Sequence, residues 1–476
     1  MAVLSDTCPP LAEDRYSRFF AERIFPLLDR ANGTSIAEKL ELLVAGERLA
    51  PAEIRRRQLG KLAHAVERTR RENPFYRDFV RRSRAREGAG PASAFAPLDG
   101  LPVVTRALLA AAGGAALTPG HGPGGRRTVV ARTSGSTGNP MTFHRTMEQE
   151  SWFWALRFRI WRWAGYRPGD PYLTINLNPR RQWKKRLQDR LFRCTYLTFN
   201  ADNQDSRRIV DALARRRIPH LNGFSSSLYV LARYMLARGI ANPGVAGVTS
   251  TGDTLLPPFR EAIESAFGVR VLDYYGAGGE GVHLASQCME SGERYHLHPE
   301  NTVVEVLDEQ GPAPPGTPGR IVITQLDNPA MPLIRYDLED VGALAPGDAL
   351  CPCGRTLPLL ERVEGRVADL IWLPDGTFLV PHFWVVLMKN LQTIERYQVI
   401  QEVAERLRVR LVAKPEARRP EIEAAVGHAV AAATRGALAV AVDWVDDIPL
   451  SGAGKRRLVI SEVSRERLGR RQEVGA

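Results

Sequence analysis

Strand-like and helix-like segments alternate between residues 127 and 302, and this alternation restricts the fold more than any other feature. Short β-branched or aromatic runs such as "HLNGF", "GVTST" and "VRVLDYY" are each separated by amphipathic stretches such as "SSSLYVLARYMLARG". Apolar residues recur at three- and four-residue spacing in the longer stretches, which is typical of helices. Strands that alternate with helices of about 10–15 residues predict an α/β core built on a parallel sheet.

Two further regions flank this core. Residues 10–85 have helical periodicity, and residues 302–346 contain β-like runs such as "TVVEVLD" and "GRIVITQL". A smaller α+β pattern follows. Because 476 residues exceed what a single core holds, we predict two domains. Residues 1–367 form a large multi-layer domain with α/β subdomains and a β-rich part, and residues 368–476 form a small mobile α+β domain.

The formal net charge of +12 is concentrated in arginine-rich clusters such as "RRRQLGK" and "RQWKKRLQDRLFR". These clusters are either solvated helix faces or attract an anionic partner such as a nucleotide, CoA or an acidic carrier protein. No motif for nucleic-acid recognition accompanies the charge. The chain has no apolar run of about 18 residues and its first residues lack a secretory pattern. We therefore expect a cytoplasmic protein that binds neither nucleic acid nor membranes.

The run "TSGSTGNP" at 133–140 lies between two strand-like segments. Gly135 and Gly138 permit positive φ angles and close backbone approach. Successive N–H groups and neighbouring hydroxyls can form a concavity for an anion. The run lacks the G-K-[ST] ending of a P-loop. Residue types alone leave two interpretations open, a phosphate-binding loop and an ordinary hairpin turn.

Four other motifs place one charged residue in a turn or at the end of a strand. Glu280 in "DYYGAGGEG" suits a metal ion, although a glycine-rich turn explains the same run. Asp340 in "PLIRYDLEDVG" can accept hydrogen bonds from ribose hydroxyls, and Arg366 lies in a Gly-Arg turn near the predicted domain boundary. Lys455 in "PLSGAGKRR" is a cation in a glycine loop, suited to stabilising a phosphate.

Taken in order, these motifs resemble the adenylate-forming superfamily of acyl-CoA synthetases, peptide-synthetase adenylation domains and luciferases. The resemblance extends from about residue 60 to 460, and it is greatest to the phenylacetate-CoA ligase branch. It implies an AMP-forming acid–CoA ligase with two half-reactions. A carboxylate, here of an aromatic acid, first attacks the α-phosphate of ATP to give an acyl-adenylate and pyrophosphate. The thiol of CoA then displaces AMP.

The resemblance also implies roles for individual residues. The lysine of the C-terminal loop would bridge the acyl carboxylate and the α-phosphate before its domain rotates away, a lid-type step. Thr137 and the glutamate would lie at Mg²⁺. The implied ATP-binding residues are Thr133, Ser134, Gly135, Ser136, Thr137, Gly138, Tyr275, Gly276, Asp340 and Arg366, and the implied catalytic residues are Lys455, Glu280 and Thr137.

Three positions depart from the family pattern. Glu280 follows Tyr275 by five residues, where the family spacing is four, and two glycines stand where Thr or Ser is usual. Leu338 and Glu339 replace the common Thr-Gly before the ribose-binding aspartate. At the hinge, Ala368 stands where an acid or a lysine is usual.

Four of the residues that can bind metal are spaced as in a structural zinc site. Cys351 and Cys353 are two positions apart, Cys288 follows the Glu280 loop, and His296 lies in the next strand-like run, "YHLHPEN". Three thiolates and one imidazole form a closed tetrahedral set. Several members of the resembled branch share such a set. His298 is a substitute ligand, and free buried thiols are the alternative.

The sequence gives less evidence about the acid substrate than about the ATP-binding residues. Phe224, Tyr275, Ala277 and the aromatic stretch 152–154 are candidate pocket residues, and each also suits a core position. His283 has no assigned role. The same ATP-binding residues would also serve other reactions. The acyl group could pass to a carrier-protein thiol or an amine in place of CoA, or the enzyme could activate nitrite for diazo formation.

A non-catalytic homologue and a DNA-binding protein are weaker alternatives. The chain is expected to be a monomer or a homodimer.

Overall fold

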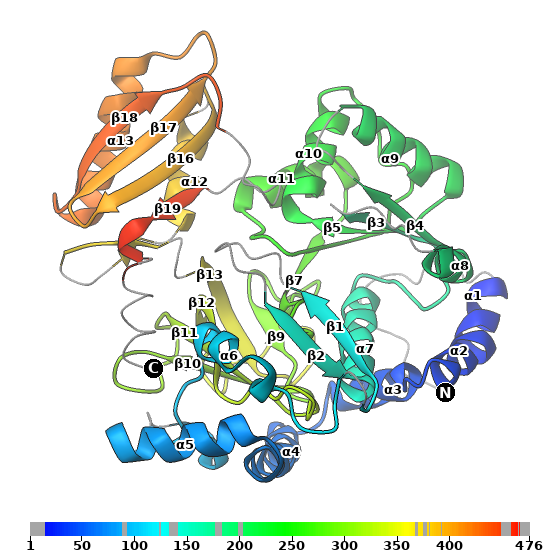
Figure 1. Ribbon diagram of the computed structural model, residues 1–476. Coiled ribbons are helices and arrows are strands. Elements are labelled where there is room, and N and C mark those ends of the chain that lie inside the picture. The colour runs from blue at the N-terminus through cyan, green and yellow to red at the C-terminus, as the bar shows by residue number, and fades with distance from the viewer. Residues whose placement is uncertain are drawn as a thin grey trace.

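The chain forms a large N-terminal part and a small C-terminal α+β part, as the computed structural model in Figure 1 shows. This arrangement confirms the predicted fold class. The structure describes residues 15–87, 93–122, 125–132, 141–176, 183–198, 203–366, 370–374, 378–379, 381–391, 393–448, 458–464 and 466.

Helices dominate the first 116 residues, as the periodicity predicts. Proline begins two of the longest helices, where its missing N–H costs nothing. The helical elements up to this point are α1 (Arg15–Phe19), η1 (Phe20–Ile24), α2 (Phe25–Ala31), α3 (Ile36–Gly46), α4 (Pro51–Glu72), α5 (Pro74–Glu87), η2 (Ala96–Leu98), α6 (Arg106–Ala112) and η3 (Gly113–Ala116).

The middle of the chain alternates strands and helices as predicted. α7 begins where the Thr146 side chain accepts a hydrogen bond from the backbone N–H of Gln149, and α11 ends at Gly268 with φ of 65°. The elements are β1 (Thr128–Arg132), β2 (Thr142–Thr146), α7 (Met147–Trp163), β3 (Tyr172–Asn176), α8 (Trp183–Leu191), β4 (Cys194–Thr198), α9 (Asn203–Arg216), β5 (His220–Phe224), α10 (Ser225–Leu236), β6 (Gly247–Thr251), α11 (Pro257–Phe267) and β7 (Val271–Ala277).

Residues 282–366 are β-rich, a longer range than the predicted 302–346. Their strands are β8 (Val282–Ser286), β9 (Tyr295–Leu297), β10 (Thr302–Leu307), β11 (Gly319–Gln325), β12 (Tyr336–Leu344) and β13 (Leu359–Arg366).

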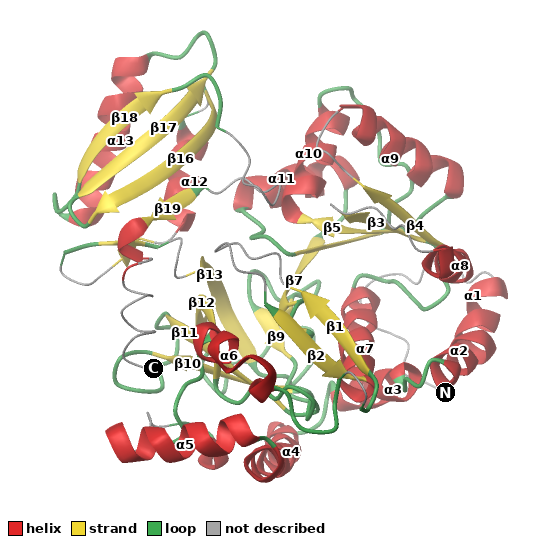
Figure 2. Cartoon of the chain, viewed as in Figure 1, coloured by secondary structure: helices red, strands yellow, loops and turns green. Residues whose placement is uncertain are grey.

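One sheet of 11 strands joins the two halves of the N-terminal part, in the order β10-β11-β12-β13-β9-β8-β7-β6-β5-β3-β4. The strands from β7 to β4 are parallel, and those from β10 to β7 are antiparallel. β7 is therefore the strand where the sheet changes direction. α9, α10 and α11 lie together against the parallel half (Figure 2).

Three large apolar clusters hold these layers together. One packs α4, α5 and α6 against the antiparallel strands and includes Phe143 of the β1–β2 hairpin. A second lies between the parallel strands and α9, α10 and α11. The third belongs to the C-terminal part.

The C-terminal part has its own four-stranded sheet, in the order β18-β17-β16-β19. Its elements are β14 (Ile371–Trp372), β15 (Phe378–Leu379), α12 (Pro381–Asn390), β16 (Ile394–Val403), β17 (Arg406–Ala413), α13 (Arg419–Thr434), β18 (Ala439–Trp444) and β19 (Val459–Ser461). Trp384 of α12 and Val426 of α13 are fully buried in its core. The last strand of the large sheet ends at Arg366, and β14, which pairs with β15 in a separate two-stranded sheet, begins at Ile371. The predicted boundary at 367/368 lies outside the described residues.

Candidate functional site

The carboxyl ends of β5, β6 and β7 lie along one edge of the parallel half-sheet, because these strands pair in parallel. Phe224 ends β5 and Ala277 ends β7, so two of the predicted pocket residues lie on this edge. The ring of Phe224 packs on Gly252, where an added Cβ would lie 2.4 Å from the ring. The chain order reverses between β3 and β5. Open α/β sheets bind ligands at such a switch point, outside the carboxyl ends of the strands.

Tyr275 and Asp340 meet across this edge. The Tyr275 hydroxyl donates a hydrogen bond of 2.6 Å to Oδ2 of Asp340, which comes from β12. Asp340 pairs in register with Arg366 of the neighbouring strand β13. Three residues to which the resemblance gives nucleotide roles therefore lie together, although the side chain of Arg366 is outside the described part of the chain.

β7 continues further than the sequence indicates. The glycines of "DYYGAGGEG" were expected to begin a loop directly after the tyrosines, but Gly276 and Ala277 still pair with His283 and Val282 of β8. The pairing is possible because Gly276 has no side chain, since a Cβ there would lie 2.5 Å from the carbonyl oxygen of Val282. The loop proper is thus confined to four residues, 278–281.

Glu280 lies in that short loop and is buried, with 8% of its surface exposed. The loop backbone is held from two sides. Gln325 of β11 donates through Nε2 to the carbonyl of Glu280, and Gln149 of α7 donates through Nε2 to the carbonyl of Gly281, both at 2.8 Å. These contacts hold the backbone of the loop despite the extra residue between Tyr275 and Glu280.

Arg145 forms a third connection to the loop. It extends from β2, and its Nη1 donates to the carbonyl of Gly278 over 3.4 Å while Nη2 lies 3.1 Å from a carboxylate oxygen of Glu150. Its side chain packs on Gly281, where an added Cβ would lie 2.0 Å from Cδ of Arg145. Arg145 therefore links the β1–β2 hairpin to the Glu280 loop.

No motif in the sequence singles out Arg145, Gln149 or Gln325. Each acts on a loop 45 to 133 residues away in the sequence. The one available signal was the position of Arg145 at the end of the strand that follows "TSGSTGNP".

The backbone of Glu339 shows how the chain does without the glycine that the family pattern has just before Asp340. Its φ is 62°, in the left-handed region that a glycine adopts easily. Its backbone N–H donates to Oδ1 of Asp337 at 2.8 Å, which supports this turn of the chain. The backbone conformation typical of glycine is thus present without the glycine, and Asp340 follows it in the paired strand β12.

Several predicted residues lie outside the described part of the chain: Thr133, Ser134, Gly135, Ser136, Thr137, Gly138, Ala368 and Lys455. The two strands that were predicted to flank the first six are present as β1 and β2. They pair antiparallel, and Arg132 is in register with Thr142 at the end beside the loop.

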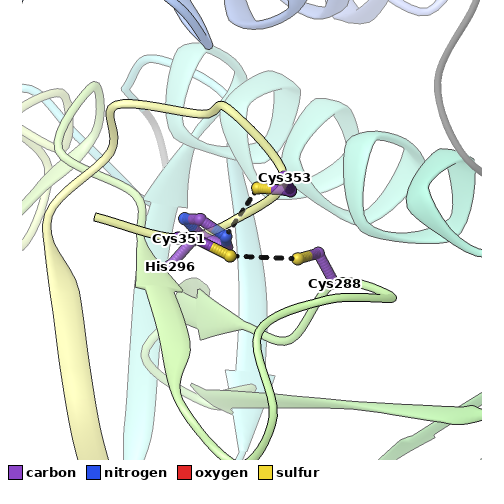
Figure 3. Close-up of side chains that lie close together, drawn as sticks. All are labelled: Cys288, His296, Cys351 and Cys353. Carbon is purple, nitrogen blue, oxygen red and sulfur yellow. Dashed lines mark hydrogen bonds between the residues drawn. The ribbon is translucent and has the colours of Figure 1, made fainter.

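The four predicted zinc ligands converge. Figure 3 shows the side chains of Cys288, His296, Cys351 and Cys353, whose donor atoms all lie within 4.8 Å of one another. The sulfurs of Cys288 and Cys351 are 3.7 Å apart, and the Cys353 sulfur lies 3.4 Å from Nε2 of His296. All four residues are buried.

These distances fit a tetrahedral zinc ion. Zn–S bonds of about 2.3 Å at tetrahedral angles place two sulfurs about 3.8 Å apart. The hydrogen bond with Cys288, together with the His296 ring, holds the pKa of the Cys353 thiol well below its usual range, which favours the thiolate form that binds zinc. The donor set therefore has the chemistry and spacing of a closed structural site.

His298 is not part of this cluster, so it does not substitute for His296. Its Nε2 lies 3.2 Å from the Ser286 hydroxyl, and its Nδ1 faces the guanidinium of Arg159. Because strand residues alternate in direction, two histidines separated by one residue share a face of β9 only while the strand continues. β9 ends at Leu297, before His298.

The aromatic stretch 152–154 divides between two environments. Trp152 belongs to a core cluster with Leu43, and Nζ of Lys61 lies 4.4 Å from its ring centroid, which is a packing role. Phe153 and Trp154 lie beside Arg157 of the same helix, and Trp154 also packs against a core cluster that contains Phe158. Within this stretch, Phe153 and Trp154 stay candidates for a substrate pocket.

No helix in the described ranges is both long and apolar enough to cross a lipid bilayer.

Known proteins match the chain at two levels. In sequence, residues 371–462 match the family model of the CapK C-terminal domain. Phenylacetate-coenzyme A ligase of Thermus thermophilus is 28% identical over 146 residues, 30% of this chain and 32% of the relative. The Escherichia coli enzyme of the same name is 31% identical over 117 residues, 24% of this chain and 25% of the relative. These matches thus span a third or less of those relatives.

In structure, the likeness covers almost the whole chain. 2-Hydroxyisobutyryl-CoA ligase in its postadenylation state has a TM-score of 0.68 and 20% identity, and the match covers 90% of this chain and 94% of that one. The same ligase in its thioesterification state gives 0.55 over the same shares. The predicted resemblance is confirmed: this chain has the fold of the adenylate-forming ligase superfamily, with distant sequence relatives named phenylacetate-CoA ligase and a C-terminal region that matches the CapK family model.

Proposed function

We propose that this protein is an AMP-forming acid–CoA ligase that activates an aromatic carboxylic acid. The observation that carries the proposal is the hydrogen bond between Tyr275 and Asp340, on the strand that leads into the Glu280 loop. Distant relatives named phenylacetate-CoA ligase and the ligase fold support the reaction class.

In the first half-reaction, a carboxylate oxygen of the acid attacks the α-phosphorus of ATP and pyrophosphate leaves. Tyr275 holds one oxygen of Asp340, which orients that carboxylate toward the ribose hydroxyls. Lys455 stabilises the negative charge that develops between the acid and the α-phosphate. Thr133 to Gly138 bind the β- and γ-phosphates.

Glu280 is the residue that would hold Mg²⁺. A buried carboxylate on a loop fixed by Gln149 and Gln325 suits a hard cation. When bound, the ion supplies charge neutralisation at the phosphates. The chain's own contribution is to keep the loop in one position.

In the second half-reaction, the CoA sulfur attacks the acyl carbonyl carbon and AMP leaves. Movement of the C-terminal part would remove Lys455 between the two steps. The TM-scores against 2-hydroxyisobutyryl-CoA ligase support such a movement. This chain gives 0.68 against the postadenylation state of that ligase and 0.55 against its thioesterification state, so the fit depends on the conformation of the ligase.

We also propose that Cys288, His296, Cys351 and Cys353 bind a structural zinc ion. The site would fasten the 351–354 turn to the segments around β8 and β9. It takes no part in the chemistry.

Acid-dependent ATP–pyrophosphate exchange tests the proposal. A panel of aromatic acids is assayed first without CoA and then with it. We expect exchange with at least one acid and acyl-CoA formation once CoA is added. Exchange without acyl-CoA formation would contradict the ligase and leave a carrier-protein thiol or an amine as the acceptor. Exchange with no acid would contradict adenylation of carboxylates and make nitrite the next substrate to assay.

A further inference from the structure

His283 of β8 is a buried polar residue for which the proposed reaction has no use. Only 4% of its surface is exposed, and neither ring nitrogen has a hydrogen-bond partner among the described residues. Burial, then Arg157 and Arg145, hold its pKa well below the ordinary value, so the imidazole is neutral and offers one donor and one acceptor. A buried donor without a partner costs about 1–3 kcal/mol. An apolar side chain would fill this place without that cost.

Arg157 of α7 also lacks a partner, in its case for a positive charge. It forms no ion pair or hydrogen bond in the described part of the chain, and its buried Nε has no partner. The guanidinium carbon lies 5.0 Å from the ring centroid of Phe153 and 4.8 Å from that of Trp154. The nearby Arg145 differs, because Glu150 neutralises it at 3.1 Å. Arg157 therefore has no carboxylate partner of its own among the described residues, whereas Arg145 interacts with both Glu150 and Glu280.

These two groups surround the same aromatic ring. His283 stacks on Phe153 with ring centroids 4.3 Å apart and 13° between the planes, and Tyr274 meets the imidazole edge-on at 5.2 Å. The Tyr274 hydroxyl already donates to Asn222, so it does not satisfy the histidine. The aromatic rings of Phe153 and Tyr274 thus form a cluster with a guanidinium and an imidazole that lack hydrogen-bond partners among the described residues.

This cluster lies on the opposite face of β7 from Tyr275 and Asp340. Successive strand residues point to opposite faces. Tyr275 reaches Asp340 on one face, whereas Tyr274 packs beside His283 on the other. A ligand bound by this cluster is therefore not the ribose, and it lies next to Gly276, whose added Cβ would be 3.3 Å from Nδ1 of His283.

We propose that Arg157 and His283 bind an anionic group on the acid substrate, so that the preferred acids carry a second anionic group besides the carboxylate that is activated. Arg157 supplies the balancing charge, and the N–H of His283 donates a hydrogen bond to the anion. Aromatic walls and a single cationic site fit an aromatic diacid. This inference rests on the proposed function for the identity of the ligand as substrate.

The test compares acids that differ by one carboxylate: benzoate with phthalate, isophthalate and terephthalate, and phenylacetate with carboxyphenylacetates. Affinity is measured by calorimetry in the presence of a non-hydrolysable ATP analogue. Relative kcat/KM is measured by pyrophosphate exchange. We expect at least one diacid to be favoured about tenfold or more, and R157Q and H283L each to reduce that preference to about twofold or less with little effect on the monoacid.

R233Q is the matched control, because Arg233 is an exposed arginine that stacks on Tyr229 within α10. It should keep the preference. Arg157 is partly exposed, so R157Q keeps the test valid even where H283L fails to fold. Equal affinity for mono- and diacids, no diacid binding, an unchanged preference in R157Q, or displacement of the diacid by pyrophosphate would each overturn the inference.

Different results would contradict the proposed ligase function and the proposed anion site. Diacid binding that depends on Arg157, without exchange by any acid, would contradict the proposed ligase and support the anion site. Exchange with monoacids, together with equal exchange and affinity for the matching diacids, would support the ligase and contradict the anion site.

Discussion

The hydroxyl of Tyr275 donates a 2.6 Å hydrogen bond to the carboxylate of Asp340, although the two residues are 65 positions apart in the sequence. The contact joins β7, where the large sheet changes from parallel to antiparallel, to β12 in its antiparallel half. It places the aromatic residue of one motif directly on the acidic residue of another. The nucleotide side of the proposed site depends on this pair.

Tyr275→Phe should therefore weaken ATP binding. A hydrogen bond to a charged group contributes about 1.5–3 kcal/mol, so we expect KM for ATP to rise about tenfold or more. The maximum rate of exchange should change less than KM. Steady-state exchange at varied ATP measures both quantities.

Tyr76→Phe is the control for this prediction. The Tyr76 hydroxyl donates a buried hydrogen bond of 2.9 Å to the carbonyl of Pro332, in a contact between α5 and a loop. Its loss should lower stability without changing KM for ATP. Equal effects of the two substitutions on KM would show that the Tyr275 hydroxyl has no special part in nucleotide binding.

The cysteine cluster should contain one zinc ion per chain. Elemental analysis of the purified protein measures it directly. Cys351→Ser and Cys353→Ser should each lose the metal and lower Tm, because metal binding contributes to the stability of the fold. Cys194→Ser should keep the metal, since Cys194 is also buried but lies outside the cluster. A wild-type protein free of zinc, or full zinc content in the Cys353 variant, would refute the site.

Gly281→Ala should impair adenylation, and Gly278→Ala should not. A Cβ at 281 would collide with Arg145, and the φ of 78° is unfavourable for alanine, whereas a Cβ at 278 meets nothing within 4 Å. Such a substitution costs more than about 1 kcal/mol. We expect the exchange rate of the Gly281 variant to fall about tenfold, and that of the Gly278 variant to stay within about twofold.

The two glycine variants are compared at equal fraction folded, judged by thermal unfolding. A Gly281 variant with wild-type exchange would mean that the position of the Glu280 loop does not affect the reaction.

The stability of the fold should fall between about pH 4 and pH 6 because of Asp273. Burial raises the pKa of this carboxyl from 3.8 to about 6 in the folded protein. The unfolded chain loses the proton first as the pH rises, so the stabilisation is present below about pH 4 and is lost as the pH passes 6. Two pKa units correspond to at most about 3 kcal/mol.

Asp273→Asn isolates this effect, because the amide cannot ionise. Its stability relative to wild type, measured by urea unfolding at pH 4.5 and 7.5, should increase with pH. The Ser250 and Tyr295 hydroxyls, which donate to Asp273, are unchanged in the variant. A difference that stays constant or decreases with pH would contradict the raised pKa.

Local patterns predicted the elements of this protein well, because helix and strand periodicity are encoded within a few residues. The flanking strands of "TSGSTGNP" and the helices around β5 and β6 follow from such patterns. The convergence of Cys288, His296, Cys351 and Cys353 was also predictable, since three thiols and an imidazole at this spacing suit one metal ion. The continuation of β7 through Gly276 was not, because it depends on the close approach of β8.

Long-range contacts explain what the sequence could not reveal. Gln149 and Gln325 resemble ordinary surface residues until the fold brings them to the Glu280 loop. The sequence shows His283 only as a histidine just after the Glu280 motif. That its ring nitrogens lack hydrogen-bond partners becomes evident once the fold places it against Phe153 and near Arg157. The left-handed φ of Glu339 likewise cannot be predicted from the sequence, because the residue at this position is not glycine.

Formation of an acyl-adenylate tests the central claim most directly. Wild-type protein and Lys455→Ala are incubated with ATP, Mg²⁺ and the best acid, without CoA, and the products are quantified by mass spectrometry. The account predicts acyl-adenylate and pyrophosphate in equal amounts from the wild type, with a rate about 10²–10³-fold lower in the Lys455 variant. Hydrolysis of ATP to ADP and phosphate, or equal rates in the two proteins, would contradict it.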